Sequence, residues 1–361
     1  MDLHKDGAAD AATRTRRWRW WLMVAINIFF LLSGQTVATL LGRLYYNEGG
    51  DSKWMATLVQ SAGFPILILA YVFFPSPRAP RGGDGAAAAA GPRPSVGVLA
   101  FVYVSIGLLV AGDNLMYSYG LLYLPVSTYS LICATQLAFN AVLARLINAQ
   151  RFTHLVLNSV VLLTFSAALL GIRADSDGAS AVPKDKYGLG FVLTLGASAT
   201  YSLILCLMQL AFQKVLKRET FSVVLEMQVF TSVVAACASV VGLFASGEWR
   251  SLGEEMKGYR KGGVSYVMTL VWTAVAWQVA SVGVVGLVFE VSSLFSNVIS
   301  TLALPVVPVF AVAFFGDKMD GEKVMAMLLG IWGFSSYIYQ HYLDDRKLKK
   351  EARDTSEAPA P

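Results

Sequence analysis

Asp113 has the clearest potential for chemistry in this sequence. It lies in a long uncharged stretch, about ten residues before the Leu124-Pro125 pair, so it is roughly 15 Å deep if this stretch crosses a membrane. Burial favours the neutral form of a carboxyl group, which could therefore load a proton on one side and release it on the other. We interpret Asp113 as a proton-coupling group. The alternative is that residues 94–112 alone form the span and Asp113 lies at the interface.

Glu226 is a second candidate for the same role. It precedes an apolar run over residues 227–247, which is long enough to span a membrane without it. In that case Glu226 would be shallow, on the cytosolic side. We therefore treat it as the reserve candidate for proton coupling.

Two pairs of polar residues have the spacing of one helix face. Gln136 and Asn140 are four residues apart, as are Asn297 and Thr301. Amide side chains can pair with the N6/N7 edge of adenine, so amides opposite a hydroxyl suit a heterocyclic solute. The alternative is that these side chains only bond neighbouring helices together.

Four further residues are candidates for binding such a solute. Asn114 and Tyr117 lie on or near the helix face that carries Asp113. Trp277 could provide a stacking surface and Gln278 an amide, although an aromatic residue in a membrane helix more often serves packing. These four residues complete the predicted substrate site.

The histidines give no support for an enzyme. His4, His154 and His341 lie in a tail or at the ends of apolar runs, so no cluster for a metal or a general base is expected at depth. The sequence has no P-loop, no HExxH motif and no nucleophile elbow. We therefore predict no cofactor and no metal site.

These polar residues must be held by helices that cross a membrane. Hydrophobic residues make up 55% of the 361 residues and charged residues 15%, and the charges are confined to short islands between apolar runs. The predicted fold is an all-α membrane protein with ten transmembrane helices. The spans are placed at residues 20–41, 54–74, 98–122, 126–145, 155–172, 187–212, 222–245, 264–288, 291–315 and 324–342.

A weak internal repeat divides these spans into two halves. PVSTYSLICATQLAFN starts at Pro125 and EVSSLFSNVISTLALP at Glu290, an offset of 165 that aligns Gln136 with Thr301. A repeat of five spans must be inverted, and inverted repeats are typical of transporters that bind solutes near the bilayer midplane. The predicted parts are a disordered N-tail (1–19), a first half (20–172), a loop (173–186), a second half (187–343) and a charged C-tail (344–361).

The basic residues predict the orientation. With ten spans, 18 of the 29 Lys and Arg residues fall on the side of the N-terminus and 11 on the other side. The positive-inside rule therefore places both termini in the cytosol. Because these residues flank apolar runs, the net charge of +5 reflects contact with a lipid bilayer rather than with nucleic acid.

Four segments carry a resemblance to a known family. They are GQTVATLLGRLYYNEGGDSKWMATLVQSAGFPIL, DNLMYSYGLLYLPVSTYSLICATQLAFN, WTAVAWQVASVGVVGLVFEVSSLFSNVIS and LPVVPVFAVAFFGDKMDGEKVMAMLLGIWGFSSYIYQHYL. In these segments, and from about Asn27 to Asp345, the chain resembles the plant purine permease family of the drug/metabolite transporter superfamily.

The resemblance implies proton-coupled uptake of adenine, cytokinins and related bases, in the plasma membrane or an internal membrane. Two alternatives remain open. An exchanger of nucleotide sugars or other phosphate-bearing solutes should place a Lys or Arg at depth, and none lies between the predicted span ends. A polytopic intramembrane enzyme is disfavoured by the absence of a catalytic motif.

Overall fold

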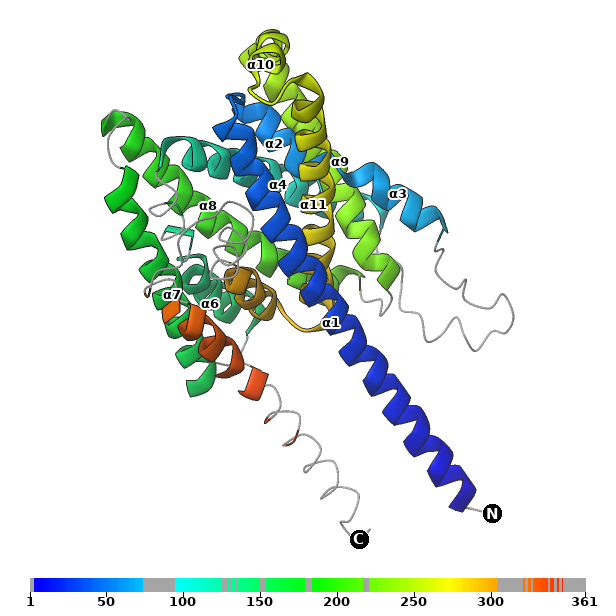
Figure 1. Cartoon of the computed structure of the whole chain (residues 1–361). Helices are drawn as coiled ribbons and strands as arrows, with labels where there is room; N and C mark the ends of the chain where they lie inside the picture. The colour runs from blue at the N-terminus through cyan, green and yellow to red at the C-terminus, as the bar shows by residue number, and fades with distance from the viewer. Residues whose placement is uncertain are drawn as a thin grey trace.

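The described part of the chain consists of helices joined by short turns. The computed structural model describes residues 3–73, 95–124, 135–149, 153–178, 184–216 and 221–303, together with short stretches within 129–133 and 321–346. These residues form helices and no strands (Figure 1). The all-α prediction is therefore confirmed for this part of the chain.

The described helices follow the predicted spans. In chain order they are α1 (Leu3–Asn47), α2 (Lys53–Ser61), α3 (Phe64–Phe73), α4 (Val96–Tyr123), α6 (Gln136–Asn148), α7 (His154–Gly178), α8 (Lys184–Leu210) with a π-helical turn (Ala211–Leu216), α9 (Phe221–Ser246), α10 (Leu252–Gly258) and α11 (Gly263–Glu290). A further apolar helix, Ser293–Ala303, is called the 293–303 helix below.

Five of the described helices are long and apolar enough to cross a membrane. They are Arg17–Asn47, Val96–Tyr123, Lys186–Leu216, Val223–Ser246 and Gly263–Glu290. Shorter apolar helical segments cover Lys53–Leu69, which contains α2 and the start of α3, and also His154–Ser166 and Ser293–Ala303. The described helices therefore support a helical membrane protein with several spans. The number of ten spans and their arrangement as inverted halves stay a prediction.

The second predicted span, 54–74, differs from expectation because it is broken in two. Helix α2 is capped at Ala62, and α3 begins at Phe64. A Cβ on Gly63 would lie 2.4 Å from the carbonyl oxygen of Ala274 in α11, so a glycine is required at this close approach. Pro65 follows in the first turn of α3, where its missing N–H is tolerated. The break therefore coincides with the contact of Gly63 with α11 and with Pro65.

The chain also turns at Leu124, as expected. This residue ends α4 with extended backbone dihedral angles, φ −104° and ψ 146°, which are those favoured before a proline. Helix α1 begins at Leu3, within the predicted N-terminal tail. The alanine-rich segment before the apolar run has high helix propensity and continues the same helix, which projects from the other helices (Figure 1).

Helices α1 and α11 pack closely along their length. A Cβ on Gly34 would lie 2.6 Å from the main-chain nitrogen of Ala280, and one on Gly283 would lie 2.6 Å from that of Leu31. Small residues allow such close approach of membrane helices. Helix α4 packs against α8 and α9, and α6 packs against α8.

A hydrogen-bonded cap closes the end of the molecule that carries α10. Glu255 accepts hydrogen bonds from the hydroxyl groups of Tyr45 (2.5 Å) and Tyr266 (3.1 Å) and from the main-chain nitrogen of Ser52 (3.3 Å). Glu248 accepts one from the Ser52 hydroxyl group at 2.7 Å and pairs with Lys53 at 3.6 Å. The turn between α1 and α2 is thereby attached to the segment between α9 and α11.

Candidate functional site

Gln136 is the centre of a buried polar cluster in which four helices meet. Its side chain accepts a hydrogen bond from the hydroxyl group of Tyr117 in α4 (3.5 Å) and donates one to Thr301 in the 293–303 helix (3.2 Å). Its main-chain carbonyl group accepts hydrogen bonds from Ser202 in α8 (2.8 Å) and from the amide of Asn297 (3.2 Å). The cluster therefore joins α4, α6, α8 and the 293–303 helix through one residue.

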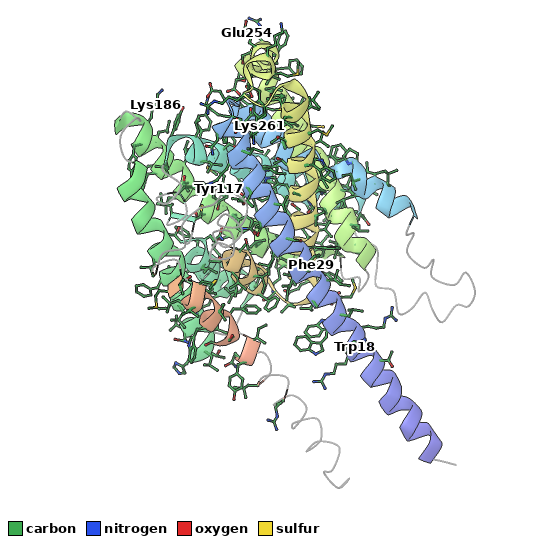
Figure 2. All side chains as sticks on the ribbon, in the orientation of Figure 1. Trp18, Phe29, Tyr117, Lys186, Glu254 and Lys261 are labelled. Carbon is green, nitrogen blue, oxygen red and sulfur yellow. The ribbon has the colours of Figure 1, made fainter. Side chains whose placement is uncertain are left out.

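The contact between Gln136 and Thr301 agrees with the internal repeat. The offset of 165 residues had aligned these two positions, and the structure brings their side chains into hydrogen-bonding contact. In the predicted inverted repeat, equivalent residues would meet at the pseudo-symmetry axis, and transporters of this architecture bind their solutes near the midplane between the halves. Tyr117 lies between the end that carries Glu254 and the end that carries Trp18 (Figure 2).

Asp113 borders this cluster one helical turn before Tyr117. The aspartate is buried, with 4% of its surface exposed, and its Oδ1 atom has no hydrogen-bond partner within the described residues. Tyr117, Tyr129 and Tyr201 are near enough to interact with it electrostatically. No described cationic group does so. Asp113 is therefore a carboxyl group that lies near phenol groups and the Cys133 thiol and has no described cationic partner.

Asn140 and Asn297 both use their amide nitrogens to bind main-chain carbonyl groups. The Asn140 nitrogen donates to the carbonyl oxygen of Ser202 at 3.3 Å, and the Asn297 nitrogen donates to that of Gln136. Both side chains are fully buried. Asn140 lies one turn after Gln136 on α6, and Asn297 lies one turn before Thr301 on the 293–303 helix, as the two four-residue spacings predicted.

Other predicted site residues form hydrogen bonds outside the Gln136 cluster. The Asn114 amide donates to Ser61 in α2 at 3.3 Å. The Gln278 amide donates to Ser232 in α9 at 3.5 Å, and the neighbouring Trp277 is half-buried. The structure therefore places Asn114 and Gln278 at contacts between other helices.

Glu226 is also distant from Asp113. It is half-buried and accepts a hydrogen bond from the hydroxyl group of Tyr103 at 3.1 Å, and the Tyr103 ring stacks on Phe230. Tyr103 precedes Asp113 by ten residues in α4, which corresponds to roughly 15 Å along the helix axis. The two carboxyl groups therefore occupy different levels of the molecule.

Sequence reasoning missed Gln35 of α1. Its amide donates to the main-chain oxygen of Ser300 at 3.3 Å, and the Ser300 hydroxyl group donates back to the Gln35 side chain at 2.9 Å. This reciprocal pair adds α1 to the helices around the cluster. An amide within an uncharged run was a signal that could have revealed it.

A stripe of small polar residues along α8 was missed as well. Its members are buried and recur every four residues: Thr194, Ser198, Ser202 and Cys206. Three of them bond carbonyl groups of α6 or of the segment before it, or contact its side chains. The four-residue period was visible in the sequence and indicates one helix face turned toward a polar neighbour.

The cluster offers neutral hydrogen-bonding groups and one carboxyl group. Within the described residues, no group of three His, Cys, Asp or Glu side chains could hold a metal ion. Amides, hydroxyl groups and phenol rings match the edges and faces of a planar heterocycle.

Comparison with known proteins gives a consistent result. The sequence model of a family described as purine nucleobase transmembrane transport matches residues 22–347. "Probable purine permease 11" of Arabidopsis thaliana is 59% identical over 345 residues, which cover 96% of this chain and 89% of the relative. "Purine permease 21" of the same plant is 52% identical over 354 residues, which cover 98% of this chain and 89% of the relative.

A solved structure supports the fold alone. A crystal structure of a protein that is 15% identical superposes with a TM-score of 0.56, and the match covers 87% of this chain and 97% of the other. At this identity the likeness carries no information about the solute.

Proposed function

The chain belongs to the family of purine nucleobase transmembrane transporters, and from this premise we propose that it is a proton-coupled symporter of purine bases such as adenine and cytokinins. The family membership confirms the resemblance noted in four segments of the sequence. The chain is an integral membrane transporter of purine nucleobases and not an enzyme.

The observation that carries the proposal is the cluster around Gln136. Its amides and hydroxyl groups come from helices of both sequence halves, and they are buried where water does not compete for their hydrogen bonds. A desolvated hydrogen bond contributes strongly to recognition, because an unpaired buried group costs about 1–3 kcal/mol. A purine base is planar and carries several hydrogen-bond donors and acceptors, which can pair with these amide and hydroxyl groups.

The coupling role is assigned to Asp113. A charged carboxylate at this depth lacks a described cation to balance it, so a cycle in which Asp113 takes up and releases a proton avoids a permanent charge in the bilayer. Its nearness to Tyr117, which bonds Gln136, provides a route from protonation to solute binding. Glu226 is the reserve candidate for this role.

The alternative within the same superfamily is an exchanger of nucleotide sugars. Phosphate groups call for Arg or Lys side chains at the binding site. The described polar cluster contains neutral side chains and one acid instead. A neutral base is therefore the better match.

The orientation and the membrane are part of the proposal. We place both termini in the cytosol, on the ground that 18 of the 29 basic residues lie on that side. The protein would work in the plasma membrane or in an endomembrane.

Uptake by the purified full-length protein in liposomes tests the proposal. Labelled adenine, a labelled cytokinin base and a labelled nucleotide sugar are compared with and without an acidic exterior. We expect the two bases to accumulate when the exterior is acidic, and a protonophore to abolish the accumulation. The proposal would be contradicted if only the nucleotide sugar were taken up. It would also be contradicted if the uptake of the bases did not depend on the pH gradient in either orientation of the protein.

A further inference from the structure

The unpaired polar groups near Gln136 are all acceptors. Within the described part of the chain, eight buried side-chain atoms lack a hydrogen-bond partner, and all eight are oxygens. Two of them are the amide oxygens of Asn140 and Asn297, and both side chains are fully buried. A group that satisfies them must therefore donate hydrogen bonds.

The neighbours of the two amides determine which end is oxygen. The nitrogen of Asn140 faces the carbonyl oxygen of Ser202, and the nitrogen of Asn297 faces that of Gln136. Turning either amide over would place one acceptor against another. The two unpaired atoms are therefore oxygens because the main chain requires the nitrogens elsewhere.

The two amides belong to one local arrangement. Asn297 and the Ser202 hydroxyl group donate to the same carbonyl oxygen of Gln136, and the carbonyl group of Ser202 accepts from Asn140. Asn140 is also four residues after Gln136 on α6, so the two residues share one helix face. Two helices that approach each other here thus contribute one unpaired acceptor each.

We propose that the amide oxygens of Asn140 and Asn297 form a subsite that selects purines carrying an N–H donor on an exocyclic amine. This rests on the proposed function, because it assumes that the Gln136 cluster binds the base. A 6-amino group carries two N–H hydrogens and a 6-methylamino group carries one, and each such hydrogen can be donated to an acceptor of this kind. A 6-oxo group would set a third acceptor against the two amide oxygens, and an unsubstituted purine would leave both unpaired.

Competition in counterflow tests the subsite on the wild-type protein. Liposomes containing the full-length protein are loaded with adenine, and the entry of labelled adenine is measured against adenine, 6-methylaminopurine, 6-dimethylaminopurine, hypoxanthine and unsubstituted purine. We expect the first two, which keep an N–H, to compete best. The other three should need concentrations about tenfold higher or more for half-inhibition. Unsubstituted purine separates lost hydrogen bonds from steric exclusion, because it is smaller than adenine.

Three variants test which residues cause the preference for adenine over unsubstituted purine. Asn140→Leu and Asn297→Leu should bring the ratio between the half-inhibiting concentrations of purine and adenine toward one, whereas Asn158→Leu, at an exposed position of α7, should leave it at the wild-type value. The ratio is measured within one preparation, so it does not depend on the amount of folded protein.

The outcomes separate the two proposals. If adenine counterflow occurs but purine or 6-dimethylaminopurine competes as well as adenine, the proposed subsite is overturned and the proposed function stands. A wild-type ratio in both Asn140→Leu and Asn297→Leu would do the same. Failure of every base to exchange, in protein that is folded, would overturn the proposed function and the subsite with it.

Discussion

Gln136 takes part in four hydrogen bonds with three neighbouring helices, so its side chain and its main chain have separable roles. The carbonyl group is bonded by Ser202 and Asn297 whatever the side chain is. The side chain contacts Tyr117 and Thr301. A substitution at this position therefore removes recognition groups while main-chain bonds between helices remain.

Gln136→Leu should raise the apparent KM for adenine by roughly 5- to 100-fold, because a lost hydrogen bond in a desolvated site is worth on the order of 1–3 kcal/mol. The measurement is initial uptake as a function of adenine concentration, normalised to protein abundance. Gln213→Leu, at an exposed glutamine, is the matched control and should keep the wild-type KM. If Gln136→Leu reduces abundance and leaves uptake per molecule unchanged, Gln136 only joins helices.

Asp113→Asn should abolish accumulation driven by a pH gradient and preserve adenine counterflow. The asparagine keeps the size and the hydrogen-bonding capacity of the side chain but cannot carry a proton. Glu226→Gln is measured beside it, and we expect it to retain accumulation. A steep dependence of uptake on external pH in Asp113→Asn, at normal abundance, would transfer the role to another group.

Helix α1 depends on glycine where it meets α11. A side chain at Gly34 would contact the main chain of Ala276 and Ala280 at 2.7 and 2.6 Å, and the main chain cannot move away cheaply. Gly42, in the same helix, has no atom within 4 Å of an added Cβ. The two glycines therefore lie in the same helix, and only Gly34 is packed against a neighbouring helix.

Gly34→Val should strongly reduce the amount of folded protein, whereas Gly42→Val should be tolerated. Valine restricts the helix backbone equally at both positions, so the difference isolates the contact with α11. Size-exclusion chromatography of a fluorescent fusion in detergent measures the monodisperse fraction. Equal yields of the two variants would show that α1 and α11 can separate without loss of the fold.

The hydrogen-bonded cap at the end that carries α10 attaches the turn between α1 and α2 to the segment between α9 and α11, and this attachment can also be tested. Glu255→Ala should lower the free energy of unfolding by about 1–3 kcal/mol, because the buried Tyr45 and the main-chain nitrogen of Ser52 lose their hydrogen bonds to the carboxylate. Thermal unfolding in detergent should show a lower Tm. Glu254→Ala removes the exposed neighbouring carboxylate and should leave Tm unchanged; an equal decrease in both variants would argue against the cap.

The two ends of the protein should face different compartments. Glu254 of α10 and Trp18 of α1 lie at opposite ends (Figure 2). With the N-terminus in the cytosol, a tag near Ser251 should be labelled by an impermeant reagent in sealed cells, whereas tags at Gly85 and Lys350 should be protected. Labelling at Gly85 with protection at Ser251 would reverse the orientation.

Much of the fold follows from local sequence. An apolar run sets the length of a membrane helix, and a proline restricts the residue before it, so the long helices and the turn at Leu124 were predictable. The sequence also indicated Gln136, Asn297 and Thr301 as candidate residues, because polar groups are rare and costly within such runs. The repeat offset alone paired Gln136 with Thr301.

The tertiary structure decided which polar residues meet. It directs Asn114 to Ser61 and Gln278 to Ser232, and it joins Gln35 to Ser300. A helix in a soluble protein shows its buried face by its hydrophobic period, but a membrane helix is apolar toward both lipid and protein, so its apolar residues do not show which face is turned inward. Contacts between distant segments depend on close packing through small residues, and only the assembled helices determine them.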